Sequence, residues 1–277
     1  MSDPGPAEIS EDALLGGKVR LLQPRRGHRA GTDAVLLAAA AGVEAGDTIV
    51  DLGSASGAVG LMIAAREPAA KLVFVERDEA LVALCRRNIA LNGLDDRARA
   101  VAAEIFAPRA ERIAAGLASE QADVVATNPP FFEREGARPS PDPGRRAAHE
   151  MAGGTLEGWI EAAADLLRPR GRLVMIHRAD ALGTCLAALA RRFGTIRVTP
   201  VQAKAGSDSV RVLLSAVKGG KAPLSLAPAL VLHKTDGRFT DAVAVMHAAP
   251  SRLRACTFAS RDLAVAWLTA EKTGRED

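Results

Sequence analysis

The segment from Thr48 to Arg66 constrains the fold of this chain more than any other. It runs from a short apolar stretch, Thr48–Leu52, through a glycine-containing loop, Gly53–Gly60, into an alanine-rich helical pattern. Strand, glycine loop and helix in this order form the first half of a βαβ unit. Because such units place their strands in parallel and cover them with helices, the segment predicts an α/β fold.

Alternating strand and helix patterns continue along the chain. We expect further strands at 71–75, 99–103, 123–127, 172–176, 196–201 and 210–217, with helices at 78–92, 109–118, 156–167 and 180–193. The last two strands are joined through Ser207-Asp208, which favours an antiparallel hairpin. The prediction is therefore a Rossmann-like, seven-stranded and mostly parallel sheet with an antiparallel closing hairpin. A helix capped by Thr32 or Asp33 should precede it, and a short strand at 229–233 and a helix near 240–247 should follow.

Composition narrows the class of protein. The three cysteines (Cys85, Cys185 and Cys256) lie far apart without a Cys-x-x-Cys pair, so we expect reduced thiols in a cytoplasmic protein and no metal site. No apolar run is long enough to cross a membrane. Aromatic residues make up 3% of the chain, which argues against a sheet that stacks RNA bases on many rings. We predict a disordered N-terminus at 1–17, one catalytic domain at 18–248 and a tail at 249–277.

Polar residues stand where the first three strands end. Asp51 lies at the end of the first strand, Glu76 at the end of the second and Glu104 at the end of the third. Open parallel sheets bind ligands at the carboxyl ends of their strands, where a carboxylate can hold the hydroxyls of a ribose. Gly53 and Gly57 allow the backbone to approach such a ligand closely. A nicotinamide dinucleotide would satisfy this pattern as well.

The fourth strand ends in Asn128-Pro129-Pro130-Phe131, which favours one chemistry. An amide oxygen and a prolyl carbonyl at this position can accept both hydrogens of a planar –NH2 group. The ring of Phe131 can stack on the molecule that carries the amine. A simple strand-to-loop turn, with an asparagine bonded to its own backbone, is the alternative.

On these residues the chain resembles Rossmann-like class I methyltransferases that depend on S-adenosylmethionine and carry an Asn-Pro-Pro-Phe/Tyr motif. It is similar, more narrowly, to the bacterial tRNA (adenine-N6) methyltransferases that modify the adenosine beside the anticodon of a valine tRNA. The resemblance covers about residues 18–248 and rests on the stretches 22–36, 48–60, 128–132, 141–146 and 210–213. It implies methylation of adenine N6 in tRNA, with S-adenosylmethionine as cofactor.

The resemblance also implies a role for each matching residue. Asp51, Gly53 and Gly57 would form the wall around the methionine part of the cofactor, while Glu76 would hold its ribose and Glu104 would lie by its adenine. Asn128 and Pro129 would take the target amine, and Phe131 would stack on the base. One residue departs from the family pattern Asp-x-Gly-x-Gly, because Ala55 replaces the second glycine. A backbone with positive φ at this position would cost alanine about 1–2 kcal/mol.

Two arginine-containing segments are candidates for contact with RNA. From Lys18 to Arg29 the chain carries five positive charges and no acidic residue, while the whole chain has a net charge of +3. We expect Arg25, Arg26 and Arg29 to bind phosphates, with a solvated loop as the alternative. The long loop at 133–150 is typical of a lid or binding element, and its Arg145 and Arg146 are further candidates.

Other functions remain open from the sequence. The same amine motif serves glutamine-N5 methylation of proteins, although the chain before Thr48 is too short for the helical domain that such enzymes carry. Guanine-N2 methylation of rRNA is a second alternative. A methyltransferase-like fold that only binds RNA is a third, and Ala55 is the residue that favours it. The sequence predicts neither the tRNA species nor the oligomeric state.

Overall fold

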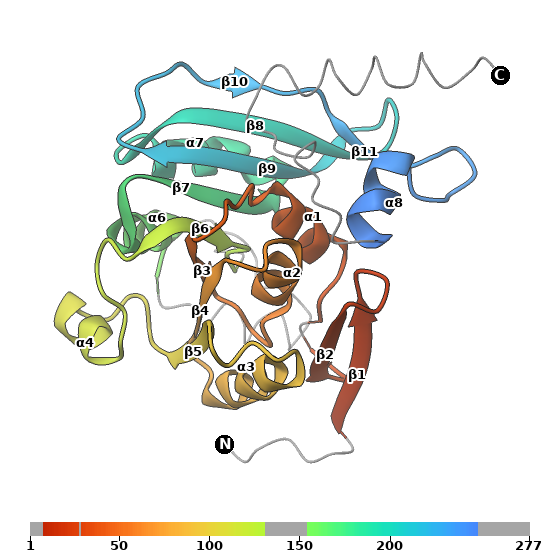
Figure 1. The fold of residues 1–277 in the computed structure, drawn as a ribbon. Coiled ribbons are helices and arrows are strands. Elements are labelled where there is room, and N and C mark those ends of the chain that lie inside the picture. Colours follow the sequence, from red (N-terminus) through yellow and green to blue (C-terminus); the bar gives the residue numbers. More distant parts are fainter. Residues whose placement is uncertain (1–7, 28, 131–153, 249–277) are drawn as a thin grey trace.

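The computed structural model describes residues 8–27, 29–130 and 154–248, and its centre is a nine-stranded sheet (Figure 1). The strand order is β10-β8-β9-β7-β6-β3-β4-β5, and β11 also pairs with β8. Their bounds are β3 (Thr48–Leu52), β4 (Lys71–Glu76), β5 (Ala98–Ala102), β6 (Ala122–Thr127), β7 (Leu167–Arg178), β8 (Phe193–Lys204), β9 (Ser209–Lys218), β10 (Ser225–Leu226) and β11 (Leu230–His233).

The predicted seven strands are all present. β5, β4, β3, β6 and β7 run parallel, and β9 lies between β7 and β8 and is antiparallel to both. The mostly parallel sheet with an antiparallel closing pair is therefore confirmed. The short strands β10 and β11 extend it beyond seven, because both pair with β8 at the edge.

Helices cover both faces of the sheet. Helices α1 (Thr32–Ala40), α2 (Ala58–Arg66), α3 (Glu79–Leu91) and α8 (Asp241–Ala248) contribute to the core on one face, and α6 (Leu156–Leu166) and α7 (Leu182–Leu189) to the core on the other. The short helix α4 (Arg109–Ala114) follows β5. Strand side chains alternate between the two cores, as Ile49 and Val50 of β3 show. Burial on both faces explains why these strands read as continuous apolar runs.

The chain begins with a β-hairpin, so the predicted disorder is wrong for residues 9–17. Strands β1 (Ile9–Leu14) and β2 (Val19–Pro24) pair in antiparallel fashion, and Gly16 and Gly17 take positive φ in the turn between them. Leu15, Val19 and Leu21 are buried in the core beside α1 and α2. Their burial outweighs the acidic composition on which the prediction of disorder rested.

The predicted cap of α1 is also wrong. Gly31 is the N-cap residue and supplies no side-chain hydrogen bond. The Asp33 carboxylate instead accepts a hydrogen bond from Arg211 of β9 at 2.8 Å. In the described part of the chain, no helix has both the length and the hydrophobicity that a membrane crossing requires. The loop at 133–150 and the tail at 249–277 lie outside the described residues.

Candidate active site

The carboxyl ends of β4, β3 and β6 lie side by side and bring three of the predicted segments together. Leu52 of β3 is in register with Val75 of β4 on one side and with Thr127 of β6 on the other. The backbone N–H groups of Gly53 and Ser54 both donate to the carbonyl of Val75, at 2.9 and 3.0 Å. The glycine loop therefore begins between the strand end that carries Glu76 and the strand end that leads into Asn128.

Three residues of this loop have left-handed backbone. The φ angles are 74° at Gly53, 47° at Ala55 and 93° at Gly57. A Cβ on Gly53 would approach the ring of Trp159 to 3.0 Å, and one on Gly57 would approach Cys85 Sγ to 2.8 Å. These two positions are thus restricted to glycine on two grounds. Ala55 occupies the left-handed region without glycine's freedom, at a cost of about 1–2 kcal/mol.

The Glu76 carboxylate connects the loop to the end of β4. Its Oε2 accepts a hydrogen bond from the Ala55 N–H at 3.0 Å. Its Oε1 accepts from the N–H groups of Arg77 and Asp78, at 2.8 and 3.1 Å. A carboxylate has about four acceptor positions, so one position on Oε2 stays open to a ligand. Glu76 is half-buried, which leaves this oxygen within reach of a bound molecule.

Glu104 lies on the neighbouring strand end, and its side chain is exposed. Its Oε1 accepts a hydrogen bond from the Phe106 N–H at 3.1 Å, and its Oε2 lies 3.5 Å from a guanidinium nitrogen of Arg77. The structure therefore brings Glu76 and Glu104 to adjacent strand ends. Whether they hold ribose and adenine stays a prediction.

Asp51 faces the protein interior. It is 2% exposed, and its Oδ2 accepts a hydrogen bond from the Gly60 N–H in the first turn of α2 at 2.8 Å. Burial raises the pKa of Asp51 to about 7, and the negative charge of Glu76 adds to the increase. This carboxyl group fixes the junction between β3 and α2, and its role beside a cofactor stays a prediction.

The end of β6 is fixed by residues that the sequence did not single out. The Thr127 hydroxyl donates to the Leu52 carbonyl at 2.8 Å and accepts from the indole N–H of Trp159 at 3.0 Å. All three groups are buried, and the same indole ring packs against Gly53. Trp159 thus holds the end of β6 against the start of the glycine loop. A lone tryptophan in a helical pattern gives no sequence signal for this role.

Asn128 and Pro129 follow Thr127 directly at the end of β6. Asn128 is half-buried and Pro129 is buried. Among the residues that the structure describes, none forms a hydrogen bond with the Asn128 carboxamide. Its oxygen is therefore free to accept a hydrogen bond from a substrate. Phe131 lies outside the described residues.

The structure divides the basic run into two groups. Arg20 pairs with Glu11 at 2.7 Å, and Arg29 pairs with Asp12 at 2.8 Å while also donating to Ser10 and to the carbonyl of Pro24. These two arginines stabilise the hairpin, so Arg29 has a structural role where the sequence suggested a phosphate contact. The side chains of Lys18, Arg25 and Arg26 are exposed and have no ion-pair partner among the described residues.

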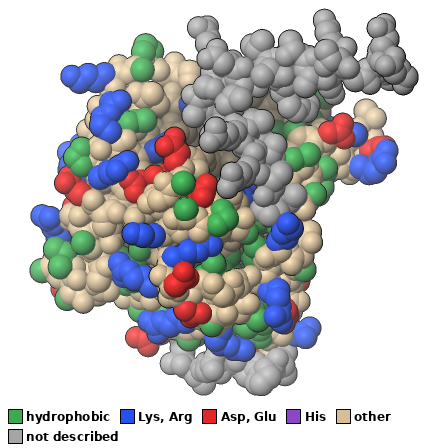
Figure 2. Space-filling model, viewed as in Figure 1, with side chains coloured by type: hydrophobic (Ala, Val, Ile, Leu, Met, Phe, Trp, Pro, Cys, Tyr) green, Lys and Arg blue, Asp and Glu red, His purple; other side chains and the backbone are tan. Residues whose placement is uncertain are grey.

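Among the described residues, the face of the protein drawn in Figure 2 has no surface patch made up of positive charges alone. On the face drawn in Figure 2, Lys and Arg side chains are interspersed with Asp and Glu.

Arg145 and Arg146 lie outside the described residues, as does Cys256. Cys85 and Cys185 are buried free thiols, and burial raises the pKa of both, which keeps them unreactive. The described segments contain no group of three or more residues able to hold a metal ion.

Comparison with known proteins places the chain in a family. Residues 30–205 match the family model described as methyltransferase small domain. A tRNA1(Val) (adenine(37)-N6)-methyltransferase of Porphyromonas gingivalis is 30% identical over 220 residues, which cover 76% of this chain and 84% of the relative. The enzyme of the same name from Aeromonas hydrophila is 28% identical over 218 residues, with 77% and 86% coverage.

Solved structures agree with the assignment of the fold. A predicted O-methyltransferase from Agrobacterium tumefaciens is 29% identical, with a TM-score of 0.66, and the match covers 78% of this chain and 97% of that chain. M. jannaschii TYW2 in complex with AdoMet, at 11% identity and a TM-score of 0.53, shows similarity of fold alone. The family match spans more than half of the chain, and the sheet has the Rossmann-like order predicted for class I methyltransferases. The chain therefore belongs to the methyltransferase small domain family.

Proposed function

We propose that this protein transfers a methyl group from S-adenosylmethionine to N6 of an adenine in tRNA. The observation that carries the proposal is the carboxamide of Asn128, which lies at the end of β6 beside the glycine loop and has no hydrogen-bond partner in the described part of the chain. The relatives that bear the name tRNA1(Val) (adenine(37)-N6)-methyltransferase match over most of their length and of this chain.

The residues at the strand ends fit the cofactor. Glu76 retains an acceptor position for a ribose hydroxyl, and glycine at 53 and 57 permits the left-handed turns that shape the loop beside it. The Ser54 hydroxyl is buried and has no partner among the described residues, so it can bond to a ligand at the loop. When bound, S-adenosylmethionine supplies an electrophilic methyl group. Asp51 would act indirectly, through its bond to Gly60, by holding the loop in shape.

The residues after β6 account for the choice of an amine. The lone pair of an exocyclic adenine amine is delocalised into the ring, which makes the nitrogen a poor nucleophile. If the Asn128 oxygen and the Pro129 carbonyl each accept one N–H, the nitrogen is held with its lone pair free to attack. Most of the acceleration then comes from positioning. Phe131 would stack on the extruded base.

Other acceptors are less well supported. The Agrobacterium protein is described as a predicted O-methyltransferase. A hydroxyl is a weak nucleophile until its proton is removed, and neither Asn128 nor the prolines after it can take a proton. An amine attacks with its lone pair and releases its proton to water after the methyl group has been transferred and S-adenosylhomocysteine has formed. The glutamine side-chain amide and guanine N2 both present an –NH2 group, so they remain the alternatives. A fold that only binds RNA would not need a free amide acceptor at this position.

We propose the hairpin as the contact for the RNA backbone. Lys18, Arg25 and Arg26 provide three exposed charges beside β2, and none of them has an ion-pair partner among the described residues. Arg29 is removed from this set because Asp12 neutralises it. Arg145 and Arg146 stay in the proposal on the sequence alone.

A labelled-methyl assay tests the function. The purified protein is incubated with methyl-labelled S-adenosylmethionine and, separately, with tRNA, rRNA or total protein, and labelled tRNA is digested for nucleoside analysis. We expect N6-methyladenosine in tRNA. Label in guanine N2, in a hydroxyl or in protein glutamine would refute the proposed acceptor, and no transfer to any fraction would refute catalysis.

Two substitutions at one position test the role of Asn128. Asn128→Ala removes the side-chain acceptor, so we expect the turnover number to fall by about 100-fold or more with little change in cofactor affinity. Asn128→Asp keeps an acceptor of the same shape and should retain far more activity than the alanine variant. Equal activity in Asn128→Ala and the unaltered protein would exclude the proposed role.

A further inference from the structure

The outer edge of β2 is completed by side chains of a helix. Asn88 of α3 accepts a hydrogen bond from the Leu22 N–H at 2.7 Å and donates to the Leu22 carbonyl at 2.8 Å. Asn92 repeats this pattern with the N–H and carbonyl of Arg20, at 3.0 and 2.7 Å. Residues four apart on a helix and two apart on a strand both lie about 6–7 Å from each other, so the spacings match. The two carboxamides thus act as the missing neighbouring strand.

Asn88 has one contact that Asn92 lacks. Its Nδ2 also donates to the carbonyl of Ser56 at 2.9 Å, and its side chain is completely buried. Ser56 lies between Ala55 and Gly57, in the middle of the glycine loop. A single buried carboxamide therefore bonds to the hairpin strand and to the loop that we assign to the cofactor.

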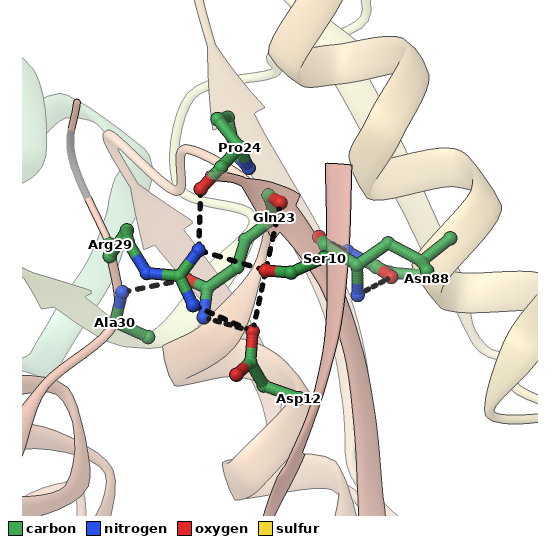
Figure 3. Close-up of polar contacts among 8 residues, drawn as sticks. Ser10, Asp12, Gln23, Pro24, Arg29, Ala30 and Asn88 are labelled. Carbon is green, nitrogen blue, oxygen red and sulfur yellow. Dashed lines mark hydrogen bonds and ion pairs between the residues drawn. The ribbon is translucent and has the colours of Figure 1, made fainter. Parts of the chain in front are cut away.

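The arginine-bearing segment is braced against the same strand. Gln23 donates to Asp12 Oδ2 at 2.9 Å and accepts from the Ala30 N–H at 2.9 Å, and Arg29 donates to the same oxygen of Asp12 (Figure 3). These contacts close the segment between Pro24 and Arg29, which carries Arg25 and Arg26. Gln23 directly follows Leu22, so the bonded groups run without a break from this segment through Asn88 to Ser56.

We propose that Asn88 is a positioning residue that couples the glycine loop to the hairpin. Cofactor binding at the loop stabilises the hydrogen bond between the Ser56 carbonyl and Asn88. Asn88 then holds β2 more firmly against α3 through its two hydrogen bonds with Leu22. Coupling of this kind is reciprocal, so a hairpin held by RNA also favours cofactor binding. The RNA side of this inference rests on the proposed function, whereas the link between loop and hairpin does not.

Amide hydrogen exchange in the unaltered protein tests the link directly. The Leu22 N–H bonds to Asn88, which also contacts the loop, whereas the more exposed Arg20 N–H bonds to Asn92, for which no bond to the loop is found among the described residues. Each amide is therefore compared with itself, with and without the cofactor. On addition of S-adenosylmethionine, we expect exchange at Leu22 to slow by about fivefold or more, and by a larger factor than at Arg20. Equal changes at both amides, or no change at either, would overturn the inference.

Matched variants separate coupling from folding. Asn88→Ala should weaken S-adenosylmethionine binding by about tenfold, because it leaves the buried carbonyl of Ser56 without its donor. Asn92→Ala loosens the same edge of β2 but keeps the bond to Ser56, so cofactor affinity should stay within about twofold of the unaltered value. Equal loss in both variants, or no loss in Asn88→Ala, would overturn the assignment.

Asn88→Asp tests whether shape alone matters. Aspartate has the volume of asparagine, but even when protonated its side chain has one hydrogen to donate, so one of the two donated bonds is lost. We expect cofactor binding to weaken here as well; an unchanged affinity would mean that Asn88 only fills space. All three measurements use S-adenosylmethionine without RNA. A failure to methylate tRNA would therefore refute the proposed function and leave this inference to be decided separately.

Discussion

Replacing Ala55 by glycine should stabilise the protein and leave cofactor affinity nearly unchanged. Ala55 has a φ of 47°, and its N–H is bonded to Glu76 within the same chain, so its strain belongs to the fold itself. Relief of left-handed strain contributes about 1–2 kcal/mol, and the added freedom of glycine in the unfolded chain removes about 0.4–1 kcal/mol. The net gain is about 0–1.6 kcal/mol in the free energy of unfolding, and its centre of about 0.8 kcal/mol is equivalent to a rise in Tm of about 2–3 °C.

Thermal unfolding followed by circular dichroism measures this gain, and titration calorimetry measures S-adenosylmethionine affinity. Ala107 is a matched control, because it is also half-buried in a loop but is not among the residues with positive φ. Ala107→Gly should lower Tm, since glycine there brings only the cost in the unfolded state. A lower Tm for Ala55→Gly would show that the loop gains nothing from glycine. A large increase in affinity without a change in Tm would show that the strain arises on binding.

Two further predictions concern charge. Burial raises the pKa of Asp51 from its ordinary value of 3.8 to about 7, so between about pH 4 and pH 7 the native state holds a proton that the unfolded state has released. The free energy of unfolding should fall as pH rises through this window. Asp51→Asn should remove this dependence, so the stability of the variant relative to the unaltered protein should increase toward pH 8. Denaturant unfolding at several pH values measures this, and parallel profiles for the two proteins would contradict the assignment. Replacing Arg25 and Arg26 with Ala should weaken tRNA binding and reduce the slope of log affinity against log salt by about 1–1.5, with cofactor affinity unchanged; a loss of affinity at constant slope would mean that these arginines do not contact phosphate.

The sheet was predictable from the sequence because its signals are local. The segments around Val50, Phe74 and Val125 are short apolar runs followed by loops and helices, and parallel strands buried on both faces require such runs. Gly53 and Gly57 are also local signals, because the loop backbone has positive φ at both positions and glycine adopts positive φ readily. The positions of Glu76 and Asn128 at neighbouring strand ends then follow from the topology.

The hairpin was not predictable, because what stabilises it lies elsewhere in the chain. β1 reads Ile-Ser-Glu-Asp-Ala-Leu, which has too few apolar residues to signal a strand. Glu11 and Asp12 gain their stability from Arg20 and Arg29, and β2 gains its outer partner from α3. The same contacts changed the prediction for RNA binding. Arg20 and Arg29, two of the five positive charges in the basic run, are neutralised by Glu11 and Asp12 of β1, a strand in the segment predicted to be disordered.

The glycine loop tolerates Ala55 because Ala55 and its neighbours are held by contacts from two other elements. The N–H groups of Gly53 and Ser54 are bonded to β4, the N–H of Ala55 itself is bonded to Glu76, and the carbonyl of Ser56 is bonded to Asn88 of α3. A strained backbone persists only where its surroundings leave it no alternative. Every one of these partners comes from β4 or α3, the elements that follow the loop in the chain. The deviation from the glycine pattern at Ala55 is therefore compensated outside the motif, by contacts that the motif itself does not contain.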